Sequence, residues 1–184
     1  MRAQISISYA IIKVVNTLSG FCGLISAVMI LLSVFITCQM IFLRSVMGVS
    51  TVWQTEAVIY LMIAATLIGL PYVQKLRGHV GVDLLPTLLP PHWKQTLTLM
   101  SLVITASMIL IMLVYGWEMF ELAARKKWRS ETVWAVPLWI PYIFVPLGFG
   151  LFLLQLIADI WQTATGQGSD NLVQIDQTEY KDIS

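Results

Sequence analysis

Uncharged residues fill four long stretches of the chain, and charged residues gather between these stretches. The uncharged stretches are residues 14–43, 57–74, 95–117 and 132–158. Because about 20 apolar helical residues cross the hydrocarbon core of a bilayer, each stretch is long enough to span it once. The pattern predicts an all-α integral membrane protein with one membrane domain over 1–161, whose four transmembrane helices lie at about 15–43, 53–74, 95–118 and 141–160.

The fourth stretch contains prolines at positions 137, 141 and 146, which a helix surrounded by lipid does not readily accept. A proline in the first turn is tolerated, because the N–H that it lacks would have no helical partner there. We therefore expect the fourth helix to begin at Pro141. Pro146 then removes the hydrogen bond to the carbonyl of Tyr142, which predicts a kink at that point.

The segments outside the spans also carry signals. Thr51 followed by Gln54 matches a capping box at the start of the second helix. The third helix is expected to continue past the membrane, because Glu121 and Arg125 form a favourable i,i+4 pair. Residues 78–94 are too short for a span and too apolar for a free loop, so they predict a short amphipathic segment along the interface. The polar tail, 162–184, is expected to be disordered.

Composition agrees with a membrane protein, since 58% of the residues are apolar and only 11% are charged. The net charge of +1 excludes a basic nucleic-acid binder. Cys22 and Cys38 lie on one apolar stretch, where a helix holds them about 24 Å apart, so a disulfide between them is excluded. The first stretch is also longer than the apolar core of a cleavable signal peptide, which predicts a retained helix.

Ionisable residues are missing from the middle of all four predicted spans, although transporter cores and membrane enzymes usually keep some there. Glu56 lies about one turn into the second helix, where it either complements the helix dipole or contacts a partner chain. His79 and His92 flank one loop without further ligands, so neither a metal nor a haem site is predicted. With no nucleophile and base in a plausible arrangement, we expect no enzymatic activity and no cofactor.

Two further features could serve a partner protein. Ser19, Gly23 and Ala27 form a stripe of small residues along the first helix, which would let another helix approach closely. The densest group of charges complements the dipole at the end of the third helix or binds a partner, and its members are Arg125, Lys126, Lys127 and Arg129. Lys and Arg are nearly equally divided between the two sides of the membrane, so charge counting leaves the orientation open.

Three motifs give the chain a family resemblance. They are WQTE at Trp53–Glu56, LRGHVGVDLL at Leu76–Leu85 and VPLWIPYIFVPLG at Val136–Gly148. Together with the four spans, they resemble the small, DctQ-type membrane subunit of tripartite ATP-independent periplasmic (TRAP) transporters. The resemblance covers almost the whole chain up to Trp161.

The resemblance implies a non-catalytic scaffold in the bacterial inner membrane, with both termini in the cytoplasm. Its implied partners are membrane lipids, a large DctM-type subunit that moves an organic acid with a sodium gradient, and a periplasmic DctP-type binding protein that delivers the acid. Two alternatives are a homo-oligomeric channel, which would need polar residues repeating on one helix face, and the membrane anchor of a redox enzyme. The residues expected at partner contacts are Ser19, Gly23, Ala27, Trp53, Glu56, Arg77, His79, Asp83, Arg125, Lys126, Lys127, Arg129, Pro137 and Trp139.

Overall fold

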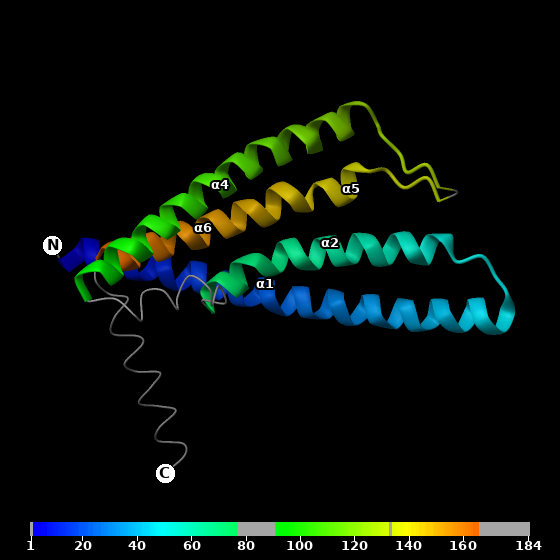
Figure 1. Ribbon diagram of the computed structural model, residues 1–184, viewed down its shortest axis with the longest axis horizontal. Coiled ribbons are helices and arrows are strands. Elements are labelled where there is room, and N and C mark those ends of the chain that lie inside the picture. Colours follow the sequence, from blue (N-terminus) through cyan, green and yellow to red (C-terminus); the bar gives the residue numbers. More distant parts are fainter. Residues whose placement is uncertain (1, 77–90, 133, 166–184) are drawn as a thin grey trace, which may run out of the picture.

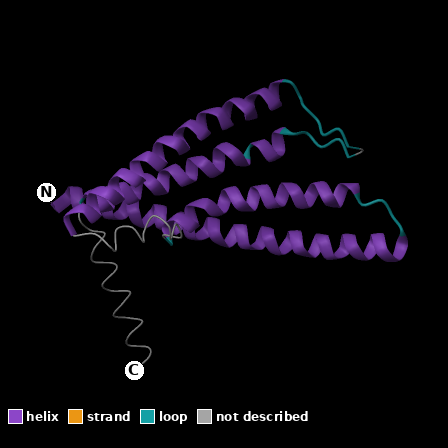
Figure 2. Cartoon of the chain, in the orientation of Figure 1, coloured by secondary structure: helices purple, strands orange, loops and turns teal. Residues whose placement is uncertain are grey.

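The computed structural model describes residues 2–76, 91–132 and 134–165. Figure 1 shows that these residues form long helices joined by short connections, and Figure 2 shows no strand among them. The elements are α1 (Arg2–Phe42), a π-helical turn η1 (Leu43–Met47), α2 (Val52–Lys75), α4 (Pro91–Arg125), α5 (Trp139–Tyr142) and α6 (Phe144–Ala164).

Four of the described helices are long and apolar enough to cross a membrane, which confirms the predicted fold class. The observed helices contain the predicted spans and extend beyond them at most ends. The helix α4, for example, continues without a break to Arg125, beyond the predicted end of the third span at residue 118. The four candidate spans are Ile12–Met47, Val52–Lys75, Thr96–Arg125 and Trp139–Ala164.

The helices form two antiparallel pairs, α1 with α2 and α4 with α5–α6, and α6 packs against α2 to join the pairs. The pairs converge at the end of the molecule where α1 begins and α6 ends, which we call the terminal end (Figure 1). They diverge toward the opposite end, where the α1–α2 and α4–α5 connections lie, which we call the loop end (Figure 1). In this arrangement α1 and α4 lie at opposite edges, and α2 and α6 lie between them.

Small residues line the contact between α1 and α2. Ser19, Ser26 and Ser33 follow one another every seven residues along α1, and all three are buried. The Ser26 hydroxyl donates a hydrogen bond of 2.7 Å to the carbonyl of Ala65 in α2. A Cβ atom at Gly69 would lie 2.8 Å from the Ser26 oxygen, so the two backbones approach as closely as a glycine allows.

The last spanning helix is interrupted near its start, as Figure 2 shows. It begins at Trp139 rather than at Pro141, so the predicted start was two residues too late. Pro141 is still within the first turn, where the N–H that it lacks needs no helical partner. The interruption at Ile143 separates α5 from α6 and lies next to the Tyr142 carbonyl, to which Pro146 cannot donate. The interruption therefore lies where the kink was predicted, and the bend itself stays a prediction because Ile143 keeps helical backbone angles.

Other expectations had mixed outcomes. Thr51 is the residue before α2, but its side chain makes no capping hydrogen bond, so the predicted capping box is wrong. The Thr51 carbonyl instead accepts from the hydroxyl of Thr55. Residues 78–90 of the predicted interfacial segment lie outside the described residues, and its last residues belong to the first turn of α4. The tail from residue 166 onward also lies outside them.

Candidate functional site

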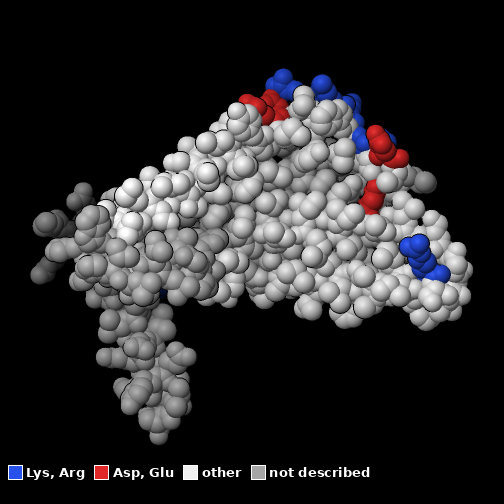
Figure 3. Space-filling view, viewed as in Figure 1, with Lys and Arg blue, Asp and Glu red and all other residues white. Residues whose placement is uncertain are grey.

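Among the described residues, charged side chains lie near the two ends of the long helices, and the middle of each span has none. At the terminal end these residues are Lys13, Lys75 and Asp159. Figure 3 shows basic side chains gathered at the loop end, over the end of α4 and the connection that follows. We call Arg125, Lys126, Lys127 and Arg129 the basic cluster; all four are exposed.

The basic cluster leads into a hairpin whose described residues are 126–132 and 134–138, which we call the 126–138 hairpin. Arg129 pairs with Pro137 in an antiparallel bridge. The N–H of Ser130 donates to the Val136 carbonyl at 2.9 Å, and the N–H of Leu138 donates to the Trp128 carbonyl at 2.9 Å. These bonds join the two arms of the hairpin, so Arg129 and Pro137 are held in one small unit.

Glu56 connects α2 to this hairpin. Its side chain projects from the first turns of α2 and is only 7% exposed. The hydroxyls of Ser130 and Thr132 both donate to its Oε1 atom. Its Oε2 atom is buried without a hydrogen-bond partner among the described residues, as is the Oε1 atom of Gln54. The carboxylate of the WQTE motif therefore binds a segment more than seventy residues away in the chain.

Tryptophans lie beside the Glu56 contact. The ring of Trp53 in α2 meets the ring of Trp134 in the hairpin edge to face, with 6.1 Å between the ring centroids. A pocket of about 260 Å³ beside them is lined by Ser50, Val52 and the two tryptophans. Trp139, which begins α5, is also exposed. Amphipathic rings in these positions suit the headgroup level of a bilayer.

The C-terminal end of α4 has a Schellman arrangement with a lysine at the position that usually holds glycine. The N–H of Trp128 donates to the Ala123 carbonyl at 3.2 Å, and the N–H of Lys127 donates to the Ala124 carbonyl at 3.4 Å. Lys127 has a φ of 49°, in the left-handed region. A side chain there costs about 1 kcal/mol relative to glycine. The lysine at position 127 therefore has a backbone conformation that is unfavourable for a residue with a side chain.

We expect Lys127→Gly to stabilise the protein by about 1 kcal/mol, because it relieves the left-handed conformation. Lys126→Gly removes the same charge from a residue without a positive φ, and it should leave stability unchanged or lower it. The thermal midpoints of the purified variants, followed by tryptophan fluorescence, measure the difference. Equal midpoints would show that Lys127 is not strained.

A second polar network, which the sequence interpretation missed, lies at the terminal end. Gln155 is 1% exposed and accepts a 2.7 Å hydrogen bond from Ser19 on α1. Its Nε2 atom donates to Asn16 and to Asp159, and Gln74 on α2 also donates to Asp159. The network joins α1, α2 and α6. The pair of Gln155 and Asp159, four residues apart in an apolar helix, was the available sequence signal.

The predicted stripe of small residues does not lie on one free helix face. Ser19 belongs to the polar network, and a Cβ atom at Gly23 would lie 2.4 Å from the Tyr72 ring of α2. Ala27 is exposed. Two of the three residues therefore serve contacts within the chain, and a partner contact at Ala27 stays a prediction. The candidates Arg77, His79 and Asp83 lie outside the described residues.

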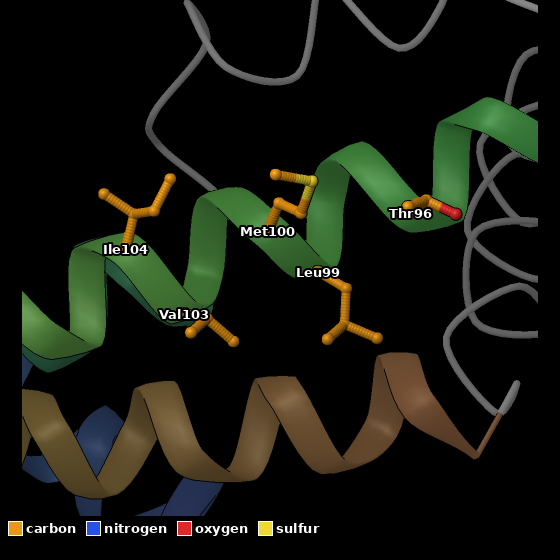
Figure 4. Close-up of a pocket in the computed structure, with 5 residues that line it drawn as sticks. All are labelled: Thr96, Leu99, Met100, Val103 and Ile104. Atoms are coloured by element: carbon orange, nitrogen blue, oxygen red, sulfur yellow. The ribbon is translucent and has the colours of Figure 1, made fainter.

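Another pocket lies along α4, as Figure 4 shows, and has a volume of about 440 Å³. Leu99 and Val103 point toward α6, whereas Met100 and Ile104 point away from it. With Thr96, these are its lining residues, so the described lining offers one hydroxyl and four apolar side chains. Nothing in this lining can transfer a proton or bind a charged solute. The described residues also contain no group of His, Cys, Asp and Glu that could hold a metal ion.

Comparisons with known proteins place the chain in a family. Residues 33–166 match the family described as tripartite ATP-independent periplasmic transporters, DctQ component. The chain is 20% identical, over 148 residues, to the C4-dicarboxylate TRAP transporter small permease protein DctQ of Vibrio cholerae serotype O1. This alignment covers 69% of the chain and 64% of that protein, and no solved structure shows significant similarity. The family match includes most of the chain, which therefore belongs to the DctQ-component family of tripartite ATP-independent periplasmic transporters.

Proposed function

We propose that the chain is a non-catalytic scaffold subunit of a TRAP transporter. In this role it supports a large membrane subunit during sodium-gradient-driven uptake of an organic acid, which a periplasmic binding protein delivers. The observation that carries the proposal is the placement of the described charged residues at the helix ends, with small and apolar residues between them. A body of this kind anchors a neighbour in the bilayer, and ion or substrate transfer is left to that neighbour.

The proposed orientation is supported by the fold and by the family to which the chain belongs. The first and last described helices, α1 and α6, place both ends of the described chain at the terminal end (Figure 1). We propose that this end faces the cytoplasm and that the bilayer is the bacterial inner membrane. The loop end, with the basic cluster and the hairpin, then faces the periplasm, where the binding protein arrives.

The basic cluster is the proposed docking surface for the binding protein. Its four cations are exposed at the loop end, and Lys127 has a backbone conformation that favours glycine. A cationic surface attracts an acidic partner and raises the rate of association. The large subunit is proposed to pack against the apolar helix faces, with Ala27 among the contacts on α1.

Reconstitution tests the scaffold role. Alone in vesicles with an inward sodium gradient, the chain should accumulate no radiolabelled C4-dicarboxylate, because the middle of its described spans carries no charged side chain that could bind an ion or carry a proton. Vesicles that also contain the large subunit and receive the binding protein should accumulate the acid, and omission of the chain should abolish uptake. Accumulation by the chain alone, or full uptake without it, would refute the proposal.

A further inference from the structure

We propose that Glu56 is a positioning residue that fixes the 126–138 hairpin on α2, so that the basic cluster is held in the geometry that docking requires. The inference rests on the proposed docking role of that cluster. It assigns to the carboxylate a purpose other than helix-dipole stabilisation or direct contact with a partner chain.

The contacts of Glu56 lie on the arm of the hairpin that carries the basic cluster. Ser130 follows Arg129 directly, and its hydroxyl and that of Thr132 donate to the same carboxylate oxygen. Successive side chains of an extended segment point in opposite directions. In agreement with this alternation, Ser130 is partly buried and bonded to Glu56, whereas Arg129 is exposed. Fixing Ser130 therefore fixes the direction in which Arg129 projects.

The hairpin transmits this position to the rest of the cluster. The backbone bonds from Ser130 to Val136 and from Leu138 to Trp128 make the two arms move together. At its other end the same arm continues into the Schellman turn at Lys127. The basic residues thus lie on a short backbone path between the end of α4 and the Glu56 contact.

Burial makes the Glu56 contact strong enough for this role. The side chain is 7% exposed, so water competes poorly for its Oε1 atom. Hydrogen bonds to an ionised acceptor are about twice as strong as neutral ones. A glutamine could accept the same two hydroxyls more weakly, which makes Glu56→Gln an intermediate variant.

The direction in which removal of Glu56 changes binding-protein affinity distinguishes a positioning role from a purely electrostatic one. Glu56 is an anion near the basic cluster, so electrostatics alone predicts that its removal strengthens binding to an acidic partner. Positioning predicts the opposite result. Glu131 is a matched control, because it lies between Ser130 and Thr132 in the same hairpin and is exposed. Glu131→Ala removes the same charge without removing the acceptor of the two hydroxyls.

The experiment compares these variants in the full chain, copurified with the large subunit. Trypsin cleavage at the basic cluster reports opening of the hairpin independently of any docking. Glu56→Ala should accelerate cleavage and weaken binding-protein affinity at low salt, each by about tenfold, because two charge-assisted hydrogen bonds are lost. Ser130→Ala with Thr132→Val should reproduce both effects, and Glu56→Gln should give smaller ones. Glu131→Ala should not accelerate cleavage, and its affinity should be unchanged or higher.

Two results would overturn the inference. Unchanged cleavage in Glu56→Ala would show that the carboxylate does not hold the hairpin. Faster cleavage with unchanged affinity would show that hairpin position does not govern docking. Charge reversal within the basic cluster shows whether unchanged affinity in Glu56→Ala means that positioning is irrelevant or that the cluster does not dock the binding protein. If reversal lowers affinity, only the positioning role is wrong; if reversal also has no effect, the cluster is not the docking surface.

Discussion

Reversal of three charges in the basic cluster should weaken capture of the binding protein more than any other surface change in the chain. The variant Arg125→Glu, Lys126→Glu, Lys127→Glu turns an attractive surface into a repulsive one. Electrostatic steering raises association rates by orders of magnitude at low ionic strength, so we expect affinity to fall by at least about tenfold. Titration of the binding protein onto the reconstituted complex at low salt measures this fall.

Salt dependence and a control at the same end of the molecule make the result specific. The difference between wild type and variant should shrink as the ionic strength rises, because exposed charges are screened beyond about 10 Å at 0.1 M salt. Arg44 is an exposed cation in η1 at the loop end, outside the basic cluster. Arg44→Glu should therefore have a much smaller effect than the triple reversal. Equal affinities for wild type and triple variant at low salt would refute the docking role.

The triple variant could also lose affinity by unfolding, and stability measurements distinguish this outcome. Arg125 pairs with Glu121 one turn earlier in α4, and the pair is exposed. An exposed pair of this kind contributes at most about 1 kcal/mol, so its loss should not unfold the helix. The thermal midpoint and the copurification with the large subunit should therefore stay close to those of wild type.

The lengths of the uncharged stretches were sufficient to predict the spanning helices, because a lipid-embedded backbone must satisfy its hydrogen bonds within a helix. The proline rule also placed the interruption beside Tyr142, since a missing N–H acts locally. The capping box at Thr51 failed for a local reason as well. A threonine hydroxyl has several acceptors and donors within reach, and a two-residue match does not determine which one it uses.

The polar contacts between distant segments could not be predicted from the pattern. Glu56 is a helix-start carboxylate by sequence, and its attachment to Ser130 depends on how α2 and the hairpin meet in space. The spacing of Gln155 and Asp159 allows a contact within α6, but the contact of Gln155 with Ser19 depends on how α1 packs against α6. The small residue Gly23 correctly indicated a close helix approach, but the sequence does not say whether the approaching helix belongs to the same chain.

Close approach of α6 to α2 predicts opposite effects for two alanine substitutions that are only two residues apart. A Cβ atom at Gly148 would lie 2.7 Å from the Leu67 carbonyl oxygen, which is backbone and cannot rotate away. A Cβ atom at Gly150 would lie 3.9 Å from the end of the Leu113 side chain, an ordinary van der Waals contact. The two sites therefore differ in the space available to one methyl group.

We expect Gly148→Ala to destabilise the chain by about 1–3 kcal/mol, because α6 must move away from α2 to make room for the methyl group. Gly150→Ala should stabilise it by up to about 1 kcal/mol, because alanine favours the helical backbone and meets no obstacle. Thermal midpoints of the purified variants, followed by tryptophan fluorescence, should shift in opposite directions. An unchanged or raised midpoint for Gly148→Ala would mean that α2 and α6 are farther apart at Gly148 than this packing requires, and the contact that joins the two helix pairs would then lie elsewhere.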